Sequence, residues 1–186
     1  MMKNMKNNIQ NLTLTALMAA ILCLMGPIVI PIGMVPVSLA NMAIYLTIIL
    51  LDKKKTLTAT VVYLLIGFVG IPVFSGFSGG VGKIFGPTGG YLMGYLILSY
   101  IGSVFLEKGK SLGNKRNLCQ FLALSAGTMG LYFVGTVWLM YQSKLDLVTA
   151  LLVGVVPFVF LDFIKILLAI SIGNAIKKRI KFNYRC

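Results

Sequence analysis

The stretch FSGFSGGVGKIFGPTGGY, residues 74–91, is the segment around which the rest of this sequence is organised. It holds seven of the chain's 20 glycines, and long apolar runs lie on both sides of it. Because glycine has no side chain, the backbone here can approach another helix or a small molecule closely. Gly86, Gly90 and Gly94 recur at every fourth position, which is the small-residue spacing of closely packed membrane helices. The stretch therefore predicts either a connection that lets the two helices on its two sides pack closely or a ligand-binding loop.

Two nucleotide-binding patterns are incomplete in this loop. A Walker A motif would need Gly at position 77 and Ser or Thr at position 84, where the chain has Phe77 and Ile84. The Gly-x-Gly-x-x-Gly pattern that begins at Gly80 fails at Phe85. We therefore expect no nucleotide site in this chain, and any use of ATP has to come from a partner.

The composition is that of an integral membrane protein. Of the 186 residues, 58% are hydrophobic and 11% are charged, whereas soluble domains carry about 25% charged residues. Six apolar segments lie near the ~20 residues that a helix needs to cross a bilayer; they cover 12–30, 36–51, 56–74, 88–106, 118–141 and 147–173. We expect an all-α integral membrane protein in which residues 1–186 form a single domain of six transmembrane helices. The first segment resembles a signal peptide but lacks a small-residue cleavage site, so we expect it to be retained as a helix.

The basic residues are unevenly distributed between the loops. If the N-terminus is inside, the outer loops hold only Lys83 and Lys144. The inner segments hold Lys3, Lys6, Lys53, Lys54, Lys55, Lys108, Lys110, Lys115, Arg116, Lys177, Lys178, Arg179, Lys181 and Arg185. The positive-inside rule then predicts that both termini are cytoplasmic and that the 74–91 loop faces out. The same distribution accounts for the net charge of +13 without nucleic acid as a partner. The helix that follows Thr88, an expected N-cap, begins on the outer side, where its N-terminus suits an anionic group.

Side chains suited to catalysis or metal binding are scarce. The chain has no histidine, and its four acids are Asp52, Glu107, Asp146 and Asp162. Its three cysteines fit no disulfide framework and no zinc spacing. Histidine is the commonest general base and metal ligand. We therefore expect no catalytic residue, no metal site, no cofactor and no enzymatic activity.

Asp162 and Lys165 are the most costly residues in the apolar segments, because a charge near the bilayer centre costs about 2.5–3.5 kcal/mol on insertion scales. They are three residues apart and so share a helix face. Two interpretations stay open: an internal ion pair, or a pair that binds the N–H groups and the carboxylate of a ligand. Ala16 and Ala20 share a face of the first segment and would allow another helix to approach it closely.

Several stretches resemble one known family. They are VPVSL at 35–39, YLLIGFVGIPVF at 63–74, SGG at 78–80, GPTGGYL at 86–92, and Pro157 and Phe158 followed by Asp162 and Lys165. These stretches look like the BioY family, the biotin-specific substrate-binding (S) components of energy-coupling factor (ECF) transporters. The block from 63 to 91 is the most specific part of the resemblance.

The resemblance implies a six-helix S-component bundle in a bacterial plasma membrane. It implies high-affinity biotin binding in an outward-facing pocket, with no ATPase in this chain. The implied partners are a membrane-embedded coupling (T) subunit, which Ala16 and Ala20 would face, and two cytoplasmic ATPase subunits.

The ligand contacts implied by the resemblance are Ser78, Gly79, Gly80, Tyr91 and Asp162. Some members have an Arg directly after the Tyr, where this chain has Leu92. Lys165, Lys83 or the nearby helix N-terminus would then hold the carboxylate of the ligand. The alternatives are a related vitamin such as lipoate or, more remotely, a membrane enzyme or assembly factor.

Overall fold

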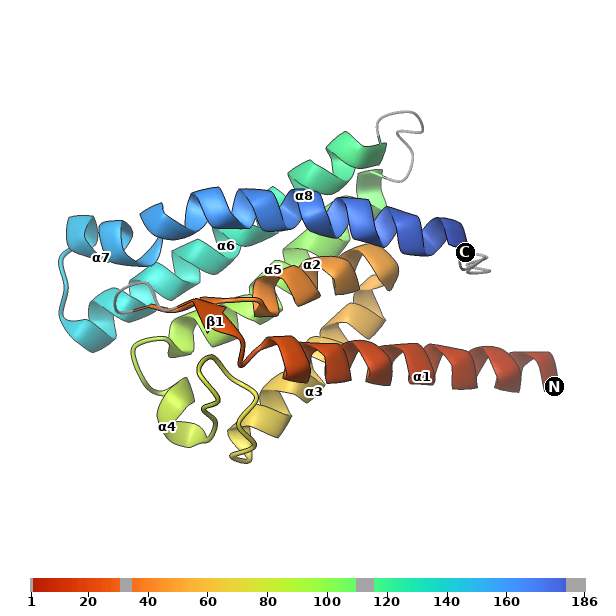
Figure 1. The fold of residues 1–186 in the computed structure, drawn as a ribbon, viewed down its shortest axis with the longest axis horizontal. Coiled ribbons are helices and arrows are strands. Elements are labelled where there is room, and N and C mark those ends of the chain that lie inside the picture. Colours follow the sequence, from red (N-terminus) through yellow and green to blue (C-terminus); the bar gives the residue numbers. More distant parts are fainter. Residues whose placement is uncertain (1, 31–34, 110–115, 180–186) are drawn as a thin grey trace.

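The computed structural model describes residues 2–30, 35–109 and 116–179, with side chains from Ile9 onward. In these ranges the chain forms eight helices and one antiparallel two-stranded ribbon (Figure 1). The elements are α1 (Met2–Met25), β1 (Val29–Ile30), β2 (Val37–Ser38), α2 (Ala40–Leu50), α3 (Lys53–Phe68), α4 (Val81–Ile84), α5 (Gly89–Lys108), α6 (Arg116–Ser143), α7 (Leu147–Gly154) and α8 (Val156–Arg179). The expected helical fold is therefore confirmed for the described part of the chain.

The two ends of the molecule differ in what they contain. The start of α1, the α2–α3 turn, the end of α5, the start of α6 and the end of α8 lie at one end, and α4, β1 and α7 lie at the other (Figure 1). The basic residues at the start of α3, at the end of α5, at the start of α6 and at the end of α8 thus gather at the first end, whereas Lys83 belongs to α4 at the second. Lys110, Lys115, Lys181 and Arg185 lie outside the described residues.

Three stretches are long and apolar enough to cross a membrane, judged on length and composition in the described residues. They are Gly89–Lys108, Arg116–Ser143 and Leu147–Arg179, the last of which contains both α7 and α8. Ile9–Met25 and Ala40–Leu50 are apolar but shorter. The expectation that every apolar segment forms a helix of nearly 20 residues was therefore too generous for α2.

Two expected helices end earlier than predicted. The segment 12–30 leaves the helix at Met25, just before Gly26 and Pro27, and continues as β1. The segment 56–74 leaves the helix at Phe68, and Gly70 then adopts a φ of 108°. A positive φ of this kind is available to glycine without steric cost and cannot continue a right-handed helix.

The segment expected as one helix over 147–173 is divided into α7 and α8. The break falls at Val155, directly before Val156 and Pro157 at the start of α8. Proline has no N–H group and its ring clashes with the carbonyl four residues earlier, so it is tolerated only in the first turn of a helix. The sequence of the segment therefore forces a new helix to begin where Pro157 stands.

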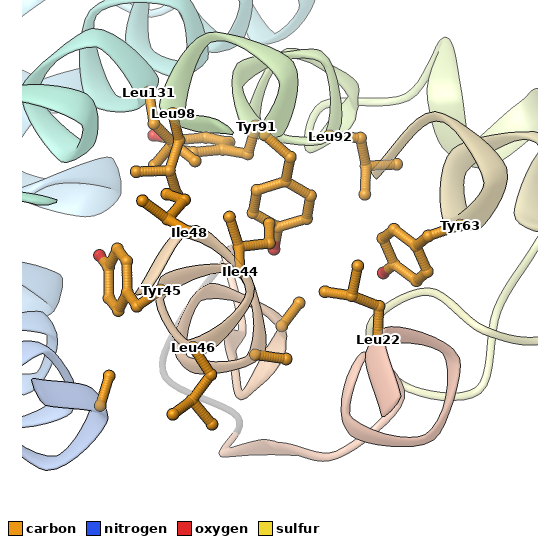
Figure 2. Packing of buried hydrophobic residues seen from close by; sticks show 14 of the residues in the cluster. Leu22, Ile44, Tyr45, Leu46, Ile48, Tyr63, Tyr91, Leu92, Leu98 and Leu131 are labelled. Atoms are coloured by element: carbon orange, nitrogen blue, oxygen red, sulfur yellow. The ribbon is translucent and has the colours of Figure 1, made fainter. Parts of the chain in front are cut away.

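The buried core is centred on α2. Of its 11 residues nine are buried, among them Ile44, Tyr45 and Ile48. Leu98 and Leu131 approach these residues from α5 and α6, and Leu22 and Tyr63 lie on the side of α1 and α3 (Figure 2). This helix of only 11 residues is thus the one that the protein surrounds most completely.

Glycines on α5 bring it close to α6. A Cβ atom added at Gly90 would lie within 3.0 Å of the Trp138 side chain, and one at Gly94 would lie 3.2 Å from Leu131. The carbonyl of Gly86 accepts a hydrogen bond of 2.9 Å from the indole N–H of Trp138. Close packing at the glycine spacing is therefore confirmed at Gly90 and Gly94, but their partner is α6 and not α3, the helix on the other side of the glycine-rich connection.

Candidate functional site

Asp162 and Lys165 form a buried ion pair in α8. Lys165 Nζ lies 3.1 Å from Asp162 Oδ1. The two residues are 1% and 7% exposed, and no other charged side chain in the described part of the chain is buried. Removing one partner from such a pair typically costs about 3–5 kcal/mol. The internal ion pair, one of the two interpretations of these residues, is therefore present in the structure.

Groups from three other elements complete the coordination of this pair. Asp162 Oδ2 accepts hydrogen bonds from the Tyr132 hydroxyl of α6 at 2.7 Å and from Asn41 Nδ2 of α2 at 3.1 Å. Lys165 Nζ donates to the Ser38 carbonyl of β2 at 2.9 Å. Buried charges are stable only when they are paired and hydrogen-bonded in this way. The pair therefore ties α2, α6 and β2 to α8.

A small cavity of about 40 Å³ lies beside the pair. Its lining comes from β2 and the two residues before it, and from α2, α5, α6 and α8. It consists of Val35, Pro36, Ser38, Asn41, Tyr91, Tyr95, Leu131, Tyr132, Phe158 and Lys165. Pockets for small molecules usually enclose about 300–1,000 Å³. The structure therefore describes a closed site, which has to widen before a vitamin-sized molecule can enter.

Tyr91 is one wall of this cavity and is also a structural tie. Its ring lies against Gly135 of α6, where an added Cβ atom would be closer than 3.0 Å to the ring. Its hydroxyl donates a hydrogen bond of 3.0 Å to the carbonyl of Gly154, the last residue of α7. The polar tip of Tyr91 is thus already in use, and its aromatic face is the part that the cavity offers to a ligand.

The loop residues predicted to bind a ligand lie outside the lining of this cavity. Phe74 is fully buried, and its backbone pairs with that of Ser78. Ser78 Oγ donates to the Ser75 carbonyl at 2.8 Å, and the Gly80 N–H donates to the Gly67 carbonyl at 2.7 Å. The loop is therefore held to the end of α3 by its own backbone and side chains.

Gly79 and Lys83 belong to the same end of the molecule. A Cβ atom on Gly79 would lie closer than 3.0 Å to the Ile71 backbone, so this position requires glycine. Lys83 is half-buried on α4, and no ion pair joins it to a carboxylate among the described residues. Thr88 is the N-cap residue of α5, as expected, although its side chain makes no capping hydrogen bond. The structure thus brings together Tyr91, Asp162 and Lys165, and it leaves Ser78, Gly79, Gly80 and Lys83 apart from them.

Ala16 and Ala20 are exposed on α1. Leu17 between them is also exposed, whereas Met18 and Ala19 face the core. The small-residue face predicted for this helix is therefore available to another molecule.

Three polar residues of the site were not predicted from the sequence: Ser38, Asn41 and Tyr132. Asn41 is the one amide in the apolar segment 36–51, and such a residue is costly in a membrane unless it is buried with a partner. That cost is a signal that could have identified it. Tyr132 carries no such signal, because tyrosine is common in apolar helices both in the core and at the membrane interface.

The fold and the site define a helical membrane protein with an ion pair beside an internal cavity. The family model described as "BioY family" matches residues 1–182 of the chain. The biotin transporter BioY2 of Lactococcus lactis is 38% identical to it, over 94% of this chain and 93% of the relative. The biotin transporter BioY of Thermotoga maritima is 34% identical, over 80% of this chain and 85% of the relative. The chain therefore belongs to the BioY family.

A solved structure agrees with this assignment. The crystal structure of the S-component for biotin from an ECF-type ABC transporter superimposes with a TM-score of 0.85 and 31% sequence identity. The match covers 93% of each chain. The arrangement of helices described above is therefore shared with a substrate-binding component and not only with membrane helices in general.

Proposed function

We propose that this chain is the biotin-binding S component of an ECF-type importer in a bacterial plasma membrane. Its membership of the BioY family and its similarity to the solved biotin S-component support the proposal. Within the molecule, the observation that carries it is the hydrogen-bonding capacity left over at the Asp162–Lys165 pair.

The pair has one acceptor position and one donor left. A carboxylate offers about four lone-pair positions, and an ammonium group offers three N–H donors. Asp162 receives one donor on Oδ1 and two on Oδ2, and Lys165 donates to Asp162 and to Ser38. The ureido ring of biotin carries N–H groups beside a C=O group. It can therefore bridge the pair without separating the two charges.

The loop over 74–91 supplies the second half of the proposed site. The cavity beside the pair is too small for biotin, so the ligand enters as this end of the molecule opens. Ser78, Gly79 and Gly80 then close over the ligand, and their backbone groups exchange the hydrogen bonds that they make to Phe74 and Gly67 for bonds to the ligand. The lack of side chains at the two glycines allows this close approach. The aromatic face of Tyr91 packs on the thioether ring of the ligand.

Lys83 is the group we assign to the carboxylate of biotin. Leu92, which follows Tyr91, is buried in the core and has no charge to offer. Lys165 already donates to two oxygen atoms. Lys83 belongs to α4, which directly precedes the start of α5, where the cavity residue Tyr91 lies. Lys83 is half-buried, which strengthens its attraction for an anion relative to a fully solvated lysine.

In the membrane, residues 1–186 form a single domain with six spans. These are α1, α2, α3, α5, α6 and the combined α7–α8, and both termini are cytoplasmic. The 11 residues of α2 cover only about 16 Å. They need not match the ~30 Å hydrocarbon core, because neighbouring helices surround α2. The basic residues at the ends of α3, α5, α6 and α8 that lie where α1 begins and α8 ends support this orientation.

The chain acts with partners because it has no nucleotide pattern of its own. These are a T subunit in the membrane and two cytoplasmic ATPase subunits, so ATP is used only through them. The exposed Ala16 and Ala20 form the contact with the T subunit, where small side chains permit close helix packing.

Titration of the purified protein with biotin, without nucleotide, tests the proposed function. We expect saturable binding in the micromolar range or tighter, and lipoate should compete weakly or not at all. Equal competition by lipoate would assign the site to another vitamin, and no saturable binding of biotin would refute the proposal. Lys83→Gln should weaken binding of biotin but not of biotin amide, which lacks the negative charge; equal weakening of both would remove Lys83 from the site.

A further inference from the structure

The two oxygen atoms of the Asp162 carboxylate have different surroundings. Oδ2 receives two neutral donors from two other helices, Tyr132 OH at 2.7 Å and Asn41 Nδ2 at 3.1 Å. Among the described residues, Oδ1 receives a hydrogen bond only from Lys165 Nζ, at 3.1 Å. Hydrogen bonds of about 2.5–2.7 Å between a hydroxyl and a carboxylate are among the strong, charge-assisted ones. Tyr132 therefore makes the shortest contact of this carboxylate among the described residues.

This asymmetry limits what the carboxylate can do for a ligand. With Oδ2 occupied on both lone-pair positions, Asp162 cannot rotate to present that oxygen to the cavity without breaking two hydrogen bonds. The one position that remains is on Oδ1, next to the free N–H of Lys165. The site thus offers a single acceptor beside a single donor.

We infer that Tyr132, with Asn41, is a positioning residue that determines specificity by reserving one acceptor position of Asp162 for one N–H group of the ligand. The inference rests on the proposed function. It goes beyond it by assigning selectivity to residues that act through Asp162. Both residues also line the cavity, so a ligand meets the carboxylate in the orientation that they fix.

The unused hydrogen-bonding positions, one acceptor on Asp162 and one donor on Lys165, also determine which class of ligand is rejected. A guanidinium group has several donors and no acceptor, so it leaves the free N–H of Lys165 without a partner and adds a like charge beside it. A neutral urea has both an N–H and a C=O and satisfies both positions. The intact site therefore favours a cyclic urea over a cyclic guanidinium of the same shape.

The test compares biotin with 2-iminobiotin, its guanidino analogue, at a pH where the analogue is cationic. Tyr132→Phe removes the hydroxyl and keeps the ring. It should weaken biotin binding about tenfold or more, as expected for loss of a hydrogen bond to a charged group. It should also lower the preference for biotin over the analogue about tenfold, because Oδ2 becomes free for a second N–H. Asn41→Ala should shift the preference in the same direction.

Tyr63→Phe is the matched control. Tyr63 is 1% exposed and also donates a hydrogen bond, of 3.2 Å to the Val73 carbonyl, but it makes no contact with Asp162. Loss of the Tyr63 hydroxyl should leave the preference for biotin over 2-iminobiotin unchanged. If Tyr132→Phe weakens both ligands equally, Tyr132 is only structural and the inference is overturned while the proposed function stands. If the unmodified protein binds no biotin, the proposed function fails and the inference fails with it.

Discussion

Replacement of Asp162 by Asn is the sharpest test of the site, because the surrounding donors dictate how the new side chain must lie. Tyr132 and Asn41 both donate to the position of Oδ2. The amide oxygen of the new Asn has to stay there, which places its NH₂ group at the position of Oδ1. That group then faces Lys165 Nζ and the N–H of the ligand, so two donors meet where a donor and an acceptor met before.

The expected loss follows from this geometry. A hydrogen bond to a charged acceptor contributes about 1.5–3 kcal/mol, so biotin affinity should fall roughly 10- to 150-fold. Calorimetric titration of the purified protein measures it. Asp146→Asn is the matched control, since Asp146 caps α7 through Thr149 at the surface, and Asn is an equally good N-cap residue. A change of less than threefold in the Asp162 variant would refute the assigned role.

A double variant separates binding from folding. Asp162→Asn alone leaves Lys165 as a buried charge without its counter-ion, so thermal stability should fall as well. Adding Lys165→Met removes the second charge, and replacing a buried pair by apolar groups is often neutral for stability. The double variant should therefore recover much of the melting temperature and none of the biotin affinity. Recovery of both would mean that the pair serves only the fold.

Three further outcomes are expected. Gly90→Ala should destabilise the protein by about 1–3 kcal/mol because its Cβ atom would overlap Trp138, whereas Gly82→Ala, with open space around it, should be close to neutral in thermal unfolding. Ala16→Trp should leave biotin binding intact and abolish uptake in cells that contain the partner subunits; normal uptake would exclude α1 from the subunit contact. Hydrogen bonds at the start of α7 lower the pKa of Asp146, so its capping contribution should be present above the ordinary carboxyl range and be lost as the pH falls through the lowered value. The protection of the α7 amides against hydrogen exchange, measured relative to the intrinsic exchange rate at each pH, should fall in that acidic range, and protection that does not change there would contradict this.

The helical, membrane-embedded character of the chain could be predicted from its apolar runs, but the ends of the helices could not. Apolar periodicity does not distinguish residues 69–74, which form a loop, from the helix before them. The end of α3 depends on Gly70, whose positive φ is a property of the folded backbone. Pro157 was visible in the sequence, and its effect on the segment 147–173 follows from its missing N–H group.

The site could be predicted only in part, because some of its residues matter only through contacts that form in the folded chain. Asp162 and Lys165 were identifiable because charge is costly in an apolar segment. Tyr132 was not, since its importance comes from the 2.7 Å contact with a residue 30 positions away. The loop predicted as half of the site illustrates the same limit. Glycine content indicated a close backbone approach, and in this structure the loop approaches the end of α3.

The unequal lengths of the helices have a consequence for the surrounding lipid. The 16 residues of α3 reach about 24 Å and the 28 residues of α6 about 42 Å, against a hydrocarbon core of ~30 Å. Apolar side chains such as Leu65 and Phe68 on α3, and Met129 and Phe133 on α6, are exposed on these two helices. With both helices as spans in the proposed arrangement, the bilayer would thin beside α3 and thicken, or let the helix tilt, beside α6. Because the mismatch is unequal around the protein, its arrangement next to other membrane proteins is not random. Contact with a partner beside the short helix α3 would remove the mismatch there.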